Sequence, residues 1–367
     1  MRDVIPWAKP NYWGNEERYL LEALHSTWIS GGPFVDKLES EFASFSGAPF
    51  TLAVASGTAA VHLALLALGI GEGDEVIVPG FAFMAVANLS LHVGATPVFA
   101  DVDPVTWCVT TKEIERRMTP RTKAIAPIHT YGNVCDMPGI CDLAESRRVP
   151  VVEDVAEALA SRYDGRLAGT FGVLGTFSFH ATKTITTGEG GMVVTKDPDL
   201  HDRMALYRSH GMRRSRAWYL HEVAGHNFRL TNLQAALGCA QLEKLSLILS
   251  ERRRVYEAYR RSLAAFEGVA LQGFDRKVEP VVWACALRLD PEAFPQGRDE
   301  LMRQMLEAGV ETRPGFYAAT AMSHIYQAAE IPVSEQLSRW VLSLPFYATL
   351  TEEHVQYACS VLSSFRR

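Results

Sequence analysis

The chain has 367 residues, of which 36 are lysine or arginine and 42 are aspartate or glutamate, giving a formal net charge of −6 at pH 7. This length predicts two domains, or one large domain with an appendage. A negative net charge argues against a nucleic-acid partner, because phosphate backbones are bound by basic surfaces. The amino terminus lacks the apolar stretch of a signal peptide, and no run approaches the ~20 apolar residues that span a bilayer. We therefore expect a cytoplasmic protein with no membrane partner.

The six cysteines are scattered and form no C-x-x-C pair, so no metal site and no redox motif is indicated. Such cysteines are typical of buried thiols in a reducing compartment. A local cluster of arginines is compatible with either a phosphate contact or a solvated surface loop. Its members are Arg213, Arg214 and Arg216.

Short apolar runs alternate with helical patterns through the first two thirds of the chain. Strands are expected at 51–55, 75–78, 96–100, 124–128, 150–153, 175–179 and 191–195, and helices at 16–26, 34–45, 59–68, 84–92, 137–147, 198–209 and 232–245. This alternation predicts βαβ units and a mainly parallel sheet in an α/β protein.

The last third of the chain differs in pattern. A long basic helix is expected at 252–266, followed by mixed strands and helices. We therefore predict a large domain with an N-terminal arm at 1–245, and a smaller α+β domain at 246–367.

The first candidate site lies between the first expected strand and the next helix, where the chain reads Ala55-Ser56-Gly57-Thr58. A helix N-terminus presents unpaired N–H groups and a partial positive charge, so it can bind a phosphate. Gly57 allows a close approach, and the two hydroxyls can add hydrogen bonds. Simple capping of the helix by Ser56 or Thr58 is an equally open interpretation.

The second candidate is Asp154, at the end of an expected strand. Ligands of open α/β sheets lie beyond the carboxyl ends of the strands. An acid at this place can contact a cofactor, although it can also cap a helix.

The third candidate is Lys183, in a loop of small uncharged residues between two apolar strands. Lysine is usually a surface residue, but near a cofactor it can form a Schiff base with an aldehyde. A surface lysine in a turn is the competing interpretation.

These three features together match the needs of pyridoxal 5'-phosphate (PLP), which requires a phosphate site, an acid for its pyridine nitrogen and a lysine for its aldehyde. Their order and spacing resemble the DegT/DnrJ/EryC1/StrS family of sugar aminotransferases over nearly the whole chain. Further matching motifs are Leu68–Pro79, Tyr131-Gly132-Asn133 with Asp136-Met137, and Gly225–Arg229.

The resemblance implies a type I PLP-dependent aminotransferase fold and a role for each matching residue. Lys183 would carry the cofactor and act as the catalytic base, and Asp154 would pair with the pyridine nitrogen. Ser56, Gly57, Thr58 and Ser178 would hold the phosphate. Phe83 would stack on the ring, although it can equally be a core residue. Asn227 would reach the cofactor of the other subunit, which implies a homodimer with shared active sites.

Glu157 stands where the family more often has glutamine, near the 3-oxygen of the cofactor. A carboxylate there would repel a phenolate unless one of the two is protonated. The alternative is that the Glu157 side chain points elsewhere. Glutamate at this place, the tract Thr186–Gly191 and the stretch Glu311–Tyr317 resemble the perosamine-synthase branch. His180 would contact the substrate. Arg313 would bind the diphosphate or the sugar, or form a structural ion pair.

The resemblance thus predicts transfer of an amino group from glutamate to carbon 4 of a keto-deoxysugar nucleotide, with the cofactor alternating between PLP and pyridoxamine phosphate (PMP). The alternatives are amination at carbon 3, a PLP-dependent sugar dehydratase or a non-catalytic relative. The resemblance implies that a dehydratase would have a histidine at position 183. Retention of Lys183, Asp154 and Ser178 argues against the last two. Thr182, where the branch often has asparagine, leaves the exact sugar open.

Overall fold

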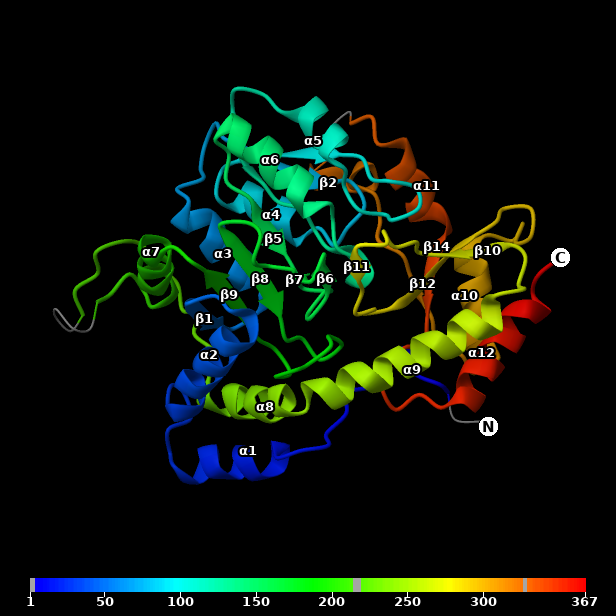
Figure 1. Cartoon of the computed structure of the whole chain (residues 1–367), viewed down its shortest axis with the longest axis horizontal. Helices are drawn as coiled ribbons and strands as arrows, with labels where there is room; N and C mark the ends of the chain where they lie inside the picture. Colours follow the sequence, from blue (N-terminus) through cyan, green and yellow to red (C-terminus); the bar gives the residue numbers. More distant parts are fainter. Residues whose placement is uncertain (1–3, 214–218, 326–328) are drawn as a thin grey trace.

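The computed structural model describes residues 4–213, 219–325 and 329–367, and Figure 1 shows a helix-covered sheet beside a C-terminal region with its own helices and strands. Of the three clustered arginines, Arg214 and Arg216 lie outside the described residues. Within these ranges, no helix is both long enough and apolar enough to cross a membrane.

The central sheet is mainly parallel, as predicted. Its strands run in the orders β3-β2-β4 and β5-β8-β9-β1. Parallel bridges from Ile125 to Val151 and from Ile128 to Asp154 join the two groups between β4 and β5. β9 runs antiparallel to both of its neighbours, and the other adjacent pairs are parallel. The strands are β1 (Phe50–Val54), β2 (Glu75–Pro79), β3 (Thr96–Ala100), β4 (Thr122–Ile125), β5 (Val152–Asp154), β8 (Leu174–Ser178) and β9 (Gly191–Thr195).

Both faces of the sheet are apolar, so helices cover both. Along β1, Leu52 and Val54 lie in one core and Ala53 lies in another, because successive side chains point to opposite faces. The first core includes α3 (Gly57–Ala67) and α7 (Pro198–Arg208). The second includes α1 (Glu16–His25), α2 (Pro33–Ser46), α6 (Met137–Arg147) and α8 (Asn232–Glu243). Two shorter helices, α4 (Ala85–His92) and α5 (Thr111–Arg117), pack near β3.

The direction of the strands gathers the candidate residues at one edge of the sheet. β1 leads through Val54 to Ser56, β5 ends at Asp154, and β8 ends at Ser178. Gly191, at the start of the antiparallel β9, pairs with both Val54 and Ser178. This edge is where ligands of parallel sheets are expected.

The C-terminal region contains an antiparallel sheet in the order β10-β12-β14-β13. Helices pack against it around a separate core. Its elements are α9 (Leu245–Leu263), β10 (Val269–Leu271), β12 (Cys285–Leu289), α10 (Arg298–Glu307), β13 (Arg313–Pro314), α11 (Pro332–Trp340), β14 (Val341–Leu344) and α12 (Glu352–Ser364). A small sheet of β6 (Arg162–Tyr163), β7 (Arg166–Leu167) and β11 (Val278–Glu279) joins this region to the large one.

Two contacts cross the predicted boundary between residues 245 and 246. Ile5 of the N-terminal arm pairs with Val310 and lies in the C-terminal core. Conversely, Ile325 and Ile331 lie in a core with residues of α4. The division of the chain at this point therefore stays a prediction.

The predicted start of the basic helix at residue 252 was wrong. α9 begins at Leu245, because the apolar stripe that it buries starts there. Its buried positions recur at helical spacing. They are Leu245, Ile248, Arg252, Val255, Ala258, Tyr259 and Leu263.

Candidate active site

The N-terminus of α3 forms one wall of the candidate site. Ser56 caps the helix, since its Oγ accepts the Ala59 N–H at 3.1 Å. The capping interpretation is therefore correct for this oxygen, but a hydroxyl that accepts one bond can still donate another. Gly57 and Thr58 open the helix, where N–H groups lack intrahelical partners. This arrangement suits an anion such as a phosphate.

The end of β8 closes against this helix start. A Cβ atom added to Gly57 would lie 2.7 Å from the Ser178 Cβ, and one added to Gly191 would lie 2.7 Å from the Ser56 carbonyl oxygen. Only glycine fits this closely at the two positions. The structure thus brings together all four residues predicted to hold a phosphate, with Thr58 exposed and Ser178 half-buried.

Lys183 lies within the fold, with 14% of its side chain exposed. Its Nζ is 3.6 Å from Glu157 Oε1 and 3.8 Å from the centre of the Trp283 ring. The backbone around it is a turn in which the Lys183 N–H donates to the His180 carbonyl at 2.9 Å. The alternative of a surface lysine in a turn is therefore wrong.

Burial changes the protonation of this lysine and of its two acidic neighbours. Burial lowers the pKa of Lys183, and the negative charges of Glu157 and Asp154 partly oppose that shift. Burial also raises the pKa of Asp154, opposed by the Ala156 N–H and by the Lys183 charge. A lysine that loses its proton more readily is a better nucleophile and base.

Asp154 and Glu153 have different partners although they are adjacent. Asp154 is at the site edge, where its Oδ1 accepts the Ala156 N–H at 3.0 Å within a turn. No helix begins at Asp154, so the capping alternative does not apply. The Glu153 carboxylate instead accepts N–H groups at 2.6 to 2.7 Å and pairs with the buried His129 ring at 3.1 Å. Those N–H groups belong to Gly169, Phe171 and Gly172.

Glu157 faces the site, so the alternative that it points elsewhere is wrong. Its Oε2 accepts the Tyr131 N–H at 2.8 Å, and its other oxygen faces Lys183. Tyr131 has a φ of 57°, a left-handed conformation that is uncommon outside glycine. Burial raises the pKa of Glu157 to about 7, opposed by Lys183 and by the Tyr131 N–H. A carboxyl group that is half protonated near neutral pH would repel an oxygen anion less than an ordinary carboxylate does.

Two aromatic residues of the site were not identified from the sequence as site residues. The Trp283 ring lies beneath Lys183, and its Nε1 donates to the Thr182 carbonyl at 2.8 Å. Tyr131 stacks on Trp283 with ring centres 6.0 Å apart and on Phe316 at 5.0 Å. Trp283 comes from the C-terminal region, so no local pattern near Lys183 indicates it. Tyr131 was part of a matching motif, but its φ value is visible only in the structure.

The other predicted contacts lie toward the surface. Phe83 is 63% exposed, so it is not a core residue; its ring is edge-on to Phe316 at 6.4 Å. His180 is on the Lys183 loop, with Nδ1 3.0 Å from Thr182 Oγ1. Arg313 forms a structural ion pair, as one of the two interpretations of this residue predicted. Its Nη2 lies 2.6 Å from Glu311 Oε1.

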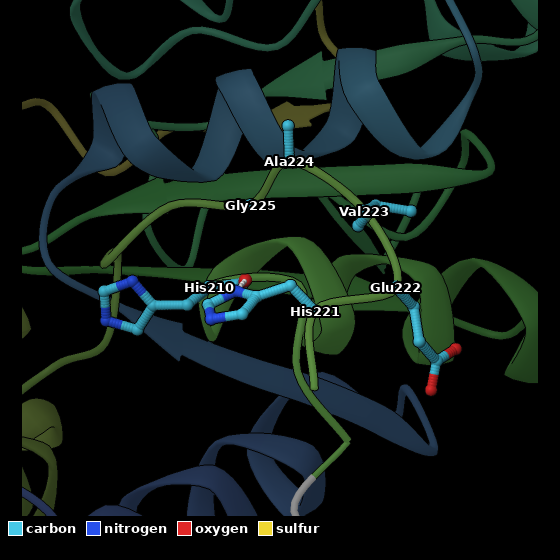
Figure 2. Close-up of a pocket in the computed structure, with 6 residues that line it drawn as sticks. All are labelled: His210, His221, Glu222, Val223, Ala224 and Gly225. Atoms are coloured by element: carbon cyan, nitrogen blue, oxygen red, sulfur yellow. Dashed lines mark hydrogen bonds between the residues drawn. The ribbon is translucent and has the colours of Figure 1, made fainter. Parts of the chain in front are cut away.

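Asn227 is exposed on a segment that returns to the end of β1. The Phe228 carbonyl accepts the Ala55 N–H at 2.8 Å, so this segment runs beside the phosphate site of its own chain. A surface pocket of about 460 Å³ lies just before it. Figure 2 shows the His210 and His221 rings extending to one side of this pocket while the Glu222 carboxylate points the other way. None of the predicted site residues lines this pocket.

The residues present fit PLP. A helix start whose glycine contacts Ser178 can receive its phosphate, and the largely buried Lys183 amine, 3.6 Å from the Glu157 carboxylate and within the influence of the Asp154 charge, can receive its aldehyde. Asp154 is buried at the same edge, so its charge would be compensated by a protonated ring nitrogen. Together with the mainly parallel sheet, this chemistry defines a PLP-dependent aminotransferase of the type I fold.

Comparisons with known proteins agree. The model of the DegT/DnrJ/EryC1/StrS aminotransferase family matches residues 12–363, and the chain belongs to this family. It is 42% identical to a GDP-perosamine synthase of Escherichia coli O157:H7 over 98% of each chain. The aminotransferase TlmJ from Streptoalloteichus hindustanus has a TM-score of 0.93 at 30% identity, covering 99% of this chain and 98% of that one. The PMP form of the putative sugar aminotransferase Spr1654 from Streptococcus pneumoniae also has a TM-score of 0.93, at 26% identity, covering 99% and 97%.

Proposed function

We propose that the protein transfers the amino group of glutamate to carbon 4 of a keto-deoxysugar nucleotide. The observation that carries the proposal is Lys183, whose largely buried Nζ lies 3.6 Å from Glu157 Oε1 and 3.8 Å from the centre of the Trp283 ring. The choice of carbon 4 rests on the Thr186–Gly191 tract and on Glu157, both of which resemble the perosamine-synthase branch. The 42% identity to a GDP-perosamine synthase supports the same choice.

PLP, when bound, supplies an electron sink that makes the α-proton of the amino donor acidic. The chain's own residues do the rest. Lys183 Nζ would hold the aldehyde of the cofactor and, once freed, would serve as the base for the α-proton of the donor. Asp154 would keep the ring nitrogen protonated by its charge. The start of α3 and Ser178 would hold the phosphate, which would keep the cofactor within reach of Lys183.

Glu157 adjusts the charge around Lys183 in this proposal. While it is ionised it favours the ammonium form of the lysine, and when protonated it can donate a hydrogen bond to an oxygen of the cofactor. Its pKa of about 7 allows both states near neutral pH. The Tyr131 N–H keeps the carboxyl group pointing into the site in either state.

We further propose a homodimer with shared active sites. Asn227 is exposed, and its segment lies beside the phosphate site, where a second copy could exchange contacts with it. In this arrangement the Asn227 amide would donate to the phosphate held by the partner.

The experiment incubates the purified enzyme with PLP, glutamate and a panel of 4-keto and 3-keto sugar nucleotides, and detects amino products by mass spectrometry. The proposal predicts an amino sugar from a 4-keto substrate, with an equal amount of 2-oxoglutarate. Lys183→Ala is the matched inactive control. Amination of only 3-keto substrates would contradict the assignment of carbon 4, and loss of water without amine incorporation would contradict transamination.

A further inference from the structure

A second concave site lies outside the candidate active site. A cleft of about 800 Å³ opens between α9 and three segments around residues 160–162, 271–274 and 279–282. Figure 1 shows α9 running below β6 and β11, the strands at whose ends two of these segments lie. This volume is in the range of pockets that hold a nucleotide-sized molecule.

The cleft is lined by four arginines and two glutamates. Among the described residues, Arg162 and Arg253 form no ion pair, whereas Arg260 pairs with Glu257 at 3.0 Å. Arg162 lies opposite Glu279 in the β6–β11 pairing, and its Nη1 donates to the Gly165 carbonyl at 2.8 Å. The other lining carboxylate is Glu279. The arginines therefore leave a surplus of positive charge.

Arg252 contributes a positive charge that is buried and therefore energetically unfavourable. It is 6% exposed, and among the described residues no acidic side chain lies within ion-pair distance of it, although its guanidinium carbon lies 4.9 Å from the centre of the Phe346 ring. Its Nη2 donates to the Val282 and Trp283 carbonyls at 3.3 and 2.6 Å, but its Nε is buried without a partner. Burial lowers the pKa of Arg252 to about 10. A buried charge without a counter-ion is strongly unfavourable, so an anion in the cleft would stabilise this region.

We infer that this cleft binds a phosphorylated small molecule of nucleotide size, with Arg162 and Arg253 contacting the phosphate and Arg252 supplying charge from the floor of the cleft. Arginine suits this ligand because its planar guanidinium group matches phosphate geometry. The apolar walls that Tyr256 and Phe274 provide would contact the organic part.

The cleft is connected to the active site through one short segment. Arg252 donates to the Trp283 carbonyl, and the Trp283 side chain donates to Thr182 and lies beneath Lys183. An anion that draws the Arg252 guanidinium toward the cleft would weaken its hydrogen bond to the Trp283 carbonyl. Ligand binding in the cleft should therefore alter the surroundings of Lys183 and shift the visible absorption of the holoenzyme.

The test measures binding of pyrophosphate and of GMP to the PLP-loaded enzyme by isothermal titration calorimetry, without amino donor. The cofactor fills its own phosphate site, and binding of either probe at the sugar-nucleotide site would not change in Arg162→Gln or Arg253→Gln, so only the binding that these variants weaken is assigned to the cleft. Arg162→Gln and Arg253→Gln should each weaken binding by roughly tenfold, the value of one lost charge-assisted contact. The visible band should shift on GMP binding to the wild type and shift less in both variants.

Arg261→Gln is the matched control, since Arg261 is on the same helix but pairs with Glu352 away from the cleft. It should bind both probes like the wild type. Tighter variant-sensitive binding of GMP than of pyrophosphate supports a nucleotide-sized ligand, whereas equal binding of the two probes would overturn that assignment. If neither probe binds, or if Arg162→Gln and Arg253→Gln bind within twofold of the wild type, the inference is wrong. None of these readouts depends on turnover, so a failure of this inference can be distinguished from a failure of the proposed aminotransferase function.

Discussion

Successive residues of a strand point to opposite faces of a sheet, and this separates Asp154 from Glu153. Glu153 accepts three backbone N–H groups and pairs with His129 in a fully buried cluster. Asp154 keeps its carboxylate at the site edge, with one N–H partner. Only Asp154 is therefore free to pair with a cofactor cation.

Replacing Asp154 with asparagine keeps the shape and removes the charge. The cofactor should still bind through the phosphate site and Lys183. Removal of the donor proton should slow by several orders of magnitude, because each 1.36 kcal/mol of lost stabilisation is about tenfold in rate. Stopped-flow bleaching of the visible band by glutamate, with cofactor occupancy measured separately, checks this. Bleaching at the wild-type rate would mean that Asp154 is a structural residue only.

The Glu157–Lys183 pair predicts a specific pH effect. Above about pH 7 Glu157 is ionised and favours the charged lysine, which cannot attack an aldehyde. Glu157→Gln removes that charge, so the pKa of Lys183 should fall further. The pH at which PLP associates at half its maximal rate should move down by roughly 1–3 units, the usual effect of one close charge.

The measurement is the rate of PLP association with the apo-protein from pH 6 to 10, followed by absorbance. Glutamine can still accept the Tyr131 N–H, so the variant should keep its thermal stability. An unchanged pH profile would show that Glu157 does not act on Lys183.

Among the elements, the junction of α3 and β8 leaves no room for a side chain at residue 57. Gly57→Ala would place a methyl group 2.7 Å from the Ser178 Cβ, so the helix start must move away from β8. Overpacking of this kind costs about 1–3 kcal/mol. We expect PLP to bind roughly tenfold to a hundredfold more weakly, as measured by fluorescence titration.

Gly71→Ala is the control for this change, because its added Cβ would meet its nearest atom at an ordinary 3.7 Å. It should bind PLP normally. Equal affinities of the two alanine variants would contradict the phosphate role of the α3 start.

The strands and most helices of the large region could be predicted from the sequence, because each buried strand is a short apolar run and each helix carries an apolar stripe. The observed β9 has the predicted bounds, and β8 is displaced by one residue. α5 was missed since its sequence TKEIERR buries only Ile114 and gives no periodic signal. β6, β7 and β11 were missed because strands of two residues carry no pattern.

At the site, the residues that belong to one local motif were predicted, and those that come from distant segments were not. Lys183 and Asp154 follow strands whose ends the sequence indicates. Trp283 reaches Lys183 only through the packing of the C-terminal region against the large one. The left-handed backbone of Tyr131 also follows from tertiary structure, since nothing in a tyrosine favours it.

At the scale of the whole molecule, the proposed dimer predicts a link between cofactor and assembly. Asn227→Ala should weaken PLP binding by roughly tenfold or more, the cost of a lost hydrogen bond to a charged group. It should also make the dimer less stable, because a ligand that bridges subunits stabilises their association by mass action. An absorbance titration measures the affinity for PLP, and sedimentation velocity with and without PLP measures the stability of the dimer. A wild-type enzyme that is monomeric and fully active would refute the shared site.

The account depends most on Lys183 as the residue that carries PLP. Reduction of the holoenzyme with borohydride fixes a lysine–PLP linkage, and peptide mass spectrometry then locates it. We predict that the pyridoxyl group is found on Lys183 and that the Lys183→Ala protein, treated in the same way, carries none. A pyridoxyl group on a different lysine, or an unlabelled wild-type protein that still transfers amino groups, would contradict the account.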